Sequence, residues 1–293
     1  MRLRFWMLCL VGLLSSCEEE LVHNSRIDGD YCMSLVQKQI DFGPRLLNSK
    51  AAKETAEWIA QEAKKAGWEV EIDEWTEKHR GKVNTYRNVI CTLSGEGKDF
   101  ILLGSHYDTK TIPGKANFIS ANDGGSSTAL LIELMKHIPK GGKSVRMVHF
   151  DGEECELNYA HNDGLHGSKR YASQLLVKGE LRSCKAMILV DMIADKDLHI
   201  AIPANGDDKL KDLTLELAKK NNWSKYFSKG TMAVLDDHVP FVDLGVPAID
   251  LIDFSYGPNN SYWHTEKDTL DKLSPRSFEI VGEVVLQMLE ELR

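Results

Sequence analysis

The chain has 293 residues, of which 42% are hydrophobic, and its 44 acidic residues outnumber the 36 basic ones to give a formal net charge of −8. This hydrophobic content excludes a disordered protein. The acidic balance, with no basic tract, argues against a nucleic-acid partner, because phosphate binding requires a positively charged surface. Six cysteines are too few for a disulfide scaffold.

The N-terminal residues have the pattern of an export signal. Arg2 and Arg4 precede an apolar run at residues 5–14, which is too short to cross about 30 Å of hydrocarbon at about 1.5 Å per residue. Residues 14–17, Leu-Ser-Ser-Cys, resemble a bacterial lipobox, in which the cysteine is lipidated; the alternative is an ordinary signal peptide with a chance cysteine. We therefore expect a lipoprotein signal peptide at residues 1–16, a tether at 17–30 and a single folded domain at 31–293. The protein would be an exported bacterial lipoprotein, periplasmic or anchored at the outer membrane or cell surface through lipid on Cys17.

Four cysteines lie beyond the lipobox: Cys32, Cys91, Cys155 and Cys184. None forms a C-x-x-C pair, which disfavours a cysteine zinc site. We expect buried free thiols, although an exported compartment would also permit a disulfide, whose pairing the sequence does not define.

The predicted elements alternate between helices and strands. A helix is expected at residues 48–66, where Asn48 or Ser49 can cap it and Gly67 can end it. Residues 68–72 alternate between apolar and acidic side chains, which is typical of a half-buried strand. Further strands are predicted at 88–93, 100–103, 145–150, 187–190 and 248–252, and helices at 126–137, 168–177, 209–221 and 274–292. This order predicts an α/β fold with a mostly parallel sheet covered on both faces.

Titratable side chains follow the ends of four of these strands or open the helix at residue 126. They are His106, Asp108, Asp123, Glu153, Glu154, Asp191 and His264. In such a sheet, ligands bind outside the carboxyl ends of the strands. Because histidine nitrogens and carboxylate oxygens are ligands that suit zinc, the sequence indicates a zinc site there.

Two spacings within this set suggest roles for individual residues. An extended backbone would point Glu153 and Glu154 to opposite sides, so that one could bind metal while the other acts as a base. Asp108, two residues after His106, could orient the imidazole of a ligand; the alternative is a simple turn residue.

Six motifs together carry a resemblance to a known family. They are GSHYDT at 104–109, NDGG at 122–125, DGEE at 151–154, the strand ending at Asp191, DDHVPF at 236–241 and WHT at 263–265. From residue 42 to the C-terminal helix, the chain resembles the zinc exopeptidase superfamily, which contains bacterial aminopeptidases and animal-type glutaminyl-peptide cyclotransferases. The resemblance implies a three-layer α/β/α sandwich around a mixed sheet, and it is closest to a bacterial glutaminyl-peptide cyclotransferase.

The resemblance also implies roles for individual residues. The implied zinc ligands are Asp123, Glu154 and His264. Glu153 takes the position of the general acid/base. In the aminopeptidase branch His106 and Asp191 complete a second zinc site with Asp123 bridging, whereas the cyclotransferase branch uses a single zinc.

Three features favour the cyclotransferase branch. The link at residues 155–166 has the length seen in cyclotransferases, Asp236 begins a DDH sequence, and Trp263 precedes the ligand histidine. Two residues depart from that pattern: Tyr159 stands where a pocket tryptophan is expected, and Asp250 stands where a network histidine is expected.

The implied activity is conversion of the N-terminal glutamine of peptides or proteins to pyroglutamate with release of ammonia. Asp191 and Asp236 would join Glu153 in catalysis, and Trp263 and Tyr159 would pack the substrate. The alternatives are a two-zinc aminopeptidase acting on peptide N-termini and an inactive binding lipoprotein.

Overall fold

The computed structural model describes residues 25–115, 118–159 and 163–293, so the expected signal peptide, Cys17 and the first part of the tether lie outside the described residues. The helices are α1 (Gly29–Phe42), α2 (Lys50–Lys65), α3 (Gly125–Leu134), α4 (His166–Val177), α5 (Asp208–Lys220), α6 (Val239–Asp243) and α7 (Pro275–Leu292). The strands are β1 (Glu69–His79), β2 (Lys82–Leu93), β3 (Phe100–His106), β4 (Ser144–Phe150), β5 (Cys184–Asp191), β6 (Ile200–Ile202), β7 (Phe227–Lys229) and β8 (Ala248–Ile252). No helix among the described residues is long and apolar enough to cross a membrane.

The main sheet is mixed, as predicted. Its strand order is β1-β2-β4-β3-β5-β8. Strands β4, β3, β5 and β8 run parallel, and the β1–β2 hairpin joins β4 in antiparallel pairing. The short strands β6 and β7 form a separate parallel pair that the sequence did not predict.

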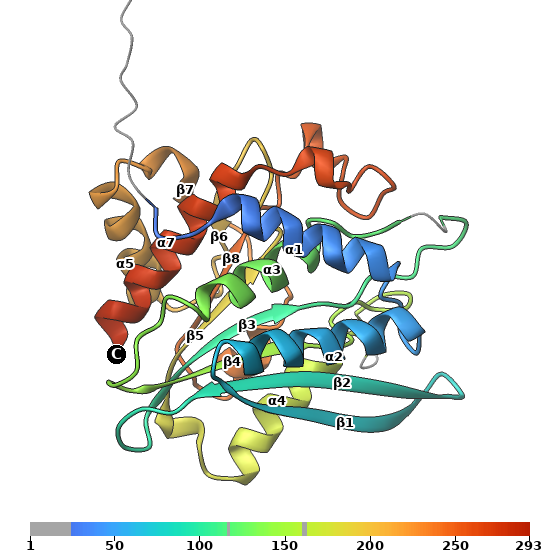
Figure 1. Ribbon diagram of the computed structural model, residues 1–293, viewed down its shortest axis with the longest axis horizontal. Coiled ribbons are helices and arrows are strands. Elements are labelled where there is room, and N and C mark those ends of the chain that lie inside the picture. The colour runs from blue at the N-terminus through green and yellow to red at the C-terminus, as the bar shows by residue number, and fades with distance from the viewer. Residues whose placement is uncertain (1–24, 116–117, 160–162) are drawn as a thin grey trace, which may run out of the picture.

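Hydrophobic cores on both faces of the sheet explain its burial. Because side chains alternate along a strand, Ile101 and Leu103 of β3 enter the core under α1, α2, α3 and α7, while Phe100 and Leu102 enter the core with α4 and α6. Figure 1 shows α1, α3 and α7 on one side of the sheet and α4 on the other. The expected three-layer α/β/α sandwich is confirmed.

Local sequence determines where several elements begin and end. The Ser49 hydroxyl accepts a hydrogen bond from the Ala52 amide at 3.0 Å and so caps α2. The β1–β2 hairpin is much longer than the two predicted strand segments. Its two-residue loop, Arg80 and Gly81, has positive φ at both positions, which suits the twist of a tight hairpin.

The fold begins earlier than the predicted domain start at residue 31. Ile27 is buried in the core, and Arg26 forms an ion pair with Glu283 of α7. The end of the expected tether therefore belongs to the folded domain. The four cysteines beyond the lipobox are buried free thiols, as expected.

Candidate active site

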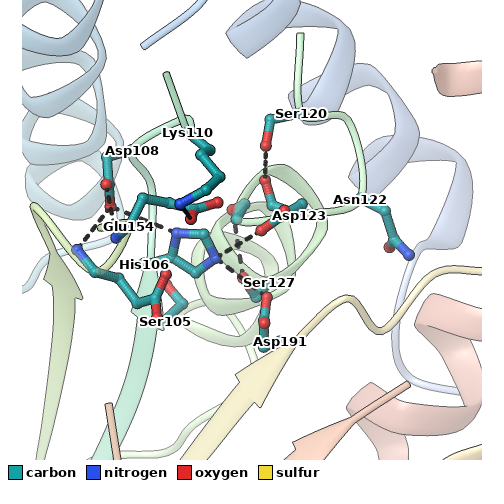
Figure 2. A network of polar contacts seen from close by, with 12 residues as sticks. Ser105, His106, Asp108, Lys110, Ser120, Asn122, Asp123, Ser127, Glu154 and Asp191 are labelled. Carbon is teal, nitrogen blue, oxygen red and sulfur yellow. Dashed lines mark hydrogen bonds and ion pairs between the residues drawn. The ribbon is translucent and has the colours of Figure 1, made fainter. Parts of the chain in front are cut away.

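The parallel strands bring their carboxyl ends to one edge of the sheet, and the predicted ligands lie at that edge. His106 is the last residue of β3, Asp191 is the last residue of β5, and Glu154 follows β4. Asp123 lies in the turn before α3. Figure 2 shows the side chains of His106, Asp123 and Asp191 converging. This is the edge at which α/β sheets bind ligands.

Asp123, Glu154 and His264 form a group that fits a metal ion. His264 Nε2 lies 3.1 Å from Glu154 Oε1 and 3.3 Å from Asp123 Oδ2, and the ligand atoms all lie within 4.8 Å of one another. Asp123 Oδ2 is buried with no hydrogen-bond partner among the described residues. Burial lowers the pKa of His264, but the neighbouring carboxylates of Asp123 and Glu154 outweigh burial and raise it to about 9. The two carboxylates therefore attract positive charge, and one histidine with two carboxylates matches a zinc ligand set.

His106, Asp123 and Asp191 form a second group beside the first. His106 Nε2 lies 3.2 Å from Asp123 Oδ1 and 3.2 Å from Asp191 Oδ1. Asp123 thus faces His264 with one oxygen and His106 with the other. This is the bridging arrangement that the resemblance implies for the two-zinc branch, so the side chains can accommodate one ion or two.

Asp108 contacts both His106 and the paired glutamates. Its carboxylate accepts hydrogen bonds from the backbone amides of Glu153 at 3.2 Å and Glu154 at 3.1 Å, and lies 3.5 Å from His106 Nδ1 (Figure 2). Gly152 makes the preceding turn with a φ of +71°, where a Cβ atom would lie 2.6 Å from the Tyr86 ring. Asp108 thus contacts both His106 and the backbone of Glu153, the predicted base.

Asp268 holds the backbone of Asp123, the predicted ligand, and the sequence analysis missed this contact. Its carboxylate accepts hydrogen bonds from the amides of Asn122 at 2.8 Å and Asp123 at 3.2 Å, and from the Tyr256 hydroxyl at 2.7 Å. Burial, together with the Asp123 charge, raises the pKa of Asp268 to about 7. Its place four residues after His264, within the stretch that begins with the WHT motif, was the available signal.

A fully buried arginine joins two of the ligand-bearing loops. Arg45 donates hydrogen bonds to the carbonyls of Tyr107 at 2.7 Å, Ile119 at 2.9 Å and Ser120 at 2.7 Å. It thereby fixes the segment after His106 to the segment before Asp123.

Glu153 has the environment expected of a general base. Burial and the neighbouring Glu154 charge raise the pKa of Glu153 well above its ordinary value. The Tyr159 hydroxyl donates a hydrogen bond to Glu153 Oε1 at 2.9 Å. Asp163 holds the segment that carries Tyr159 by accepting hydrogen bonds from the amides of Glu156, Leu157 and Asn158. Tyr159 thus contacts the predicted base directly.

Asp236 and Asp250 form a buried acidic pair next to Asp191. Burial and the charges of Asp191 and Asp237 raise the pKa of Asp236, while burial and the charges of Asp236 and Asp191 raise that of Asp250. Asp250, which stands where the cyclotransferase pattern has a histidine, therefore lies among carboxylates in a fully buried position.

A cavity of about 660 Å³ brings the predicted site residues together. Its walls include Asp123, Glu153, Glu154, Tyr159, Asp191, Asp236, Trp263 and His264. His106 is not part of the wall, because it lies behind Asp123 and Asp191. The Trp263 ring stacks on His264 with centroids 4.0 Å apart, and the Phe254 ring makes a T-shaped contact with Trp263 with centroids 5.1 Å apart. Lys110 lies outside the predicted set, with its Nζ atom 3.3 Å from Glu154 Oε2 (Figure 2).

Comparison with known proteins identifies the family. A family model described as Peptidase family M28 matches residues 88–289. The chain belongs to this family. A crystal structure of a glutaminyl cyclase from an Acidobacteriales bacterium is 36% identical, with a TM-score of 0.86, and the match covers 92% of this chain and 95% of that one.

Two further similarities are more distant. The glutaminyl-peptide cyclotransferase of Drosophila melanogaster is 26% identical over 254 residues, covering 77% of this chain and 70% of the relative. A Zn-dependent exopeptidase from Parabacteroides distasonis is 24% identical, with a TM-score of 0.80, and shares the fold over 90% of this chain and 98% of its own. These similarities confirm the family resemblance inferred from the motifs.

Proposed function

We propose that the protein is a zinc-dependent glutaminyl-peptide cyclotransferase, which converts N-terminal glutamine of peptides and proteins to pyroglutamate and releases ammonia. The observation that carries the proposal is the hydrogen bond from the Tyr159 hydroxyl to Glu153, the proposed base. Tyr159 belongs to the long link at residues 155–166, which has the length seen in cyclotransferases. Both the link and Asp236 favour the cyclotransferase branch. Similarity to a glutaminyl cyclase over 92% of the chain adds support.

The reaction requires proton transfer within one substrate residue. When bound at Asp123, Glu154 and His264, zinc supplies a Lewis acid that polarises the side-chain amide carbonyl. Glu153 accepts a proton from the α-amine as the amine nitrogen bonds to the amide carbon. The bond from that carbon to the amide nitrogen then breaks, and Glu153 returns the proton to the leaving ammonia. Because nucleophile and carbonyl belong to one residue, proximity supplies much of the rate.

The remaining wall residues bind and orient the substrate in this proposal. Asp191 and Asp236 lie on the cavity wall, where their oxygens can accept hydrogen bonds from the α-amine. Trp263 and Tyr159 present aromatic surface that can pack the flat glutaminyl group. Glu153 is held for proton transfer by its hydrogen bond from Tyr159.

The direct test incubates a Gln-initiated peptide with the zinc-loaded protein and follows two products by mass spectrometry. We expect loss of ammonia with the peptide otherwise intact. The His106–Asp123–Asp191 group favours the second candidate, a two-zinc aminopeptidase. That enzyme would bind two zinc ions tightly, hydrolyse a leucyl anilide and remove the first residue, and such a result would overturn the cyclotransferase proposal. Peptide binding without either product would instead indicate an inactive binding lipoprotein.

The lipobox-like sequence at residues 14–17 supports export and lipid anchoring at Cys17. In this proposal the enzyme acts on peptide N-termini from the membrane surface, in the periplasm or outside the cell. Labelling with a fatty acid in bacteria should mark the wild-type protein and not Cys17→Ala. A wild-type protein without label would contradict the anchor and leave the active-site proposal intact.

A further inference from the structure

The active-site cavity extends well beyond the reacting groups. A volume of about 660 Å³ matches cavities that hold drug-sized molecules, which are larger than one glutaminyl residue. The acidic side chains of the wall are Asp123, Glu153, Glu154, Asp191 and Asp236. The rest of the wall includes β6, β7 and the segment 230–235, and none of the described wall residues there is acidic.

Large hydrophobic side chains remain exposed on the rim of this second part. Met232 is 76% exposed, Leu235 is 49% exposed and Phe254 is 37% exposed, and all three line the cavity. A single exposed apolar residue requires no explanation, but several gathered at one cavity mark a place where apolar ligand surface binds.

The rim is held in place by the segment that follows β6. The Met232 carbonyl accepts a hydrogen bond from the Ala204 amide at 2.8 Å. Asn205 bonds to both backbone groups of Val234, donating to its carbonyl at 2.9 Å and accepting from its amide at 3.1 Å. A rim fixed in this way loses little conformational entropy when a ligand binds.

We propose that this rim is a subsite for an apolar side chain at the second position of the peptide substrate, an inference that rests on the proposed cyclisation. The α-amine and the side-chain amide that react both belong to the first residue, so both must lie at the acidic end of the cavity. The chain leaves that residue through its carbonyl, which places the second residue in the remaining volume. There it meets Met232, Leu235 and Phe254, and its apolar surface is removed from water.

The test compares ammonia release from Gln-Leu-Gly-amide and Gln-Ser-Gly-amide by the zinc-loaded protein. We expect kcat/KM to favour the leucine peptide by about tenfold, the lower end of discrimination by an apolar pocket. The difference should lie mainly in KM, because the second residue does not contact the reacting atoms. Met232→Ser should reduce the ratio to about twofold, since it removes part of that apolar contact. Val177→Ser, the same kind of change at a residue of α4 that is 86% exposed, should leave the ratio unchanged.

Equal kcat/KM values for the two peptides, or a wild-type ratio in Met232→Ser, would overturn the subsite while leaving cyclisation in place. If neither peptide releases ammonia, the proposed function and the subsite fail together.

Discussion

Two buried aspartates, Asp73 on the edge strand β1 and Asp236 in the active-site cavity, have opposite electrostatic surroundings. Asp73 accepts hydrogen bonds from Arg170 Nε at 2.6 Å, Arg170 Nη2 at 2.7 Å and Gln174 at 2.8 Å. Burial raises the pKa of Asp73, but these bonds outweigh it, so the pKa is lowered. Burial and the charges of Asp191 and Asp237 instead raise the pKa of Asp236.

The two aspartates differ in whether a positively charged side chain balances the buried carboxylate. On β1, an arginine neutralises the buried acid. In the cavity, the described structure gives neither Glu153 nor Asp236 an ion pair with lysine or arginine, so each retains a proton more readily. Buried acids with raised pKa values that share a cavity with metal-binding side chains are typical of catalytic sites.

Of the changes that test this contrast, removing the metal should have the largest effect on activity. Chelation should abolish ammonia release completely, because the carbonyl-polarising ion is lost, and added zinc should restore it. It should also lower the melting temperature, since a ligand present at 1,000 times its Kd stabilises the folded state by about 4 kcal/mol. Calorimetry with and without zinc measures the shift.

The control for chelation is His264→Ala, which removes one proposed ligand. Its melting temperature should respond little to zinc. Full activity after dialysis against chelator, with no zinc detected by mass spectrometry, would show that the cavity acids work without a metal.

Replacing the base should have the next largest effect. Glu153→Gln removes the proton acceptor, and turnover should fall by about 10²- to 10⁴-fold while zinc remains bound. The proposed mechanism requires a deprotonated Glu153, and the pKa of Glu153 is raised. The rate should therefore fall as pH falls through a value above the ordinary pKa of glutamate, 4.5.

The matched control is Glu74→Gln, at an exposed glutamate paired with Arg87 on the β1–β2 hairpin. It should retain wild-type turnover and pH profile. If Glu153→Gln kept more than half of the wild-type kcat, Glu153 could not be the base.

The grouping of the side chains at this site could be predicted from the sequence because parallel strands bring their carboxyl ends together. Asp191 directly follows one continuous apolar run and His106 follows another after two residues, and the carboxyl ends of parallel strands meet at one edge of a sheet. The contacts of Arg45 and Asp268 could not be predicted in the same way. They bind backbone groups of segments far along the chain. The place of Asp268 four residues after His264 ties it to the site, but no spacing identifies the amides that it contacts.

The elements that were missed also have physical reasons. Strands β6 and β7 have three residues each, which is too short for a periodic pattern to appear. In α1, Cys32, Leu35 and Val36 are buried at helical spacing. The helical pattern was therefore present in the sequence, but it begins directly beside the expected tether and was not recognised. The Tyr159–Glu153 contact depends on a loop held by Asp163, which local propensity does not determine.

A smaller effect is expected when the support of a ligand is weakened. Asp268→Asn replaces one of the two carboxylate oxygens that accept hydrogen bonds from the Asn122 and Asp123 amides. Zinc affinity should fall by about 10- to 100-fold, the usual cost of losing an outer-shell partner. Competition with a chelating dye measures the affinity.

Asp253→Asn is the matched control, because Asp253 is also fully buried but accepts hydrogen bonds from Ser255 and His199. It should reduce stability without changing zinc affinity. Equal zinc affinities for the Asp268 and Asp253 variants would show that Asp268 acts only in folding.

The smallest effect should come from the neutralised acid on β1. Asp73→Asn removes a charge that Arg170 already balances, and turnover should not change. Unfolding in urea should show a loss of about 1 kcal/mol in the free energy of unfolding at pH 7, near the upper end for partly exposed ion pairs.

The pH dependence of this loss can also be predicted. Because the folded pKa of Asp73 is lowered, this contribution to stability is fully present above the unfolded pKa of about 3.9 and is lost as pH falls through the folded pKa. The difference between wild type and Asp73→Asn should therefore shrink in acid, whereas Asp212→Asn, at an exposed aspartate paired with Lys229, should differ little at any pH. A turnover defect in Asp73→Asn would mean that the edge strand and the cavity are coupled, and the contrast between the two aspartates would no longer separate structural from catalytic charge.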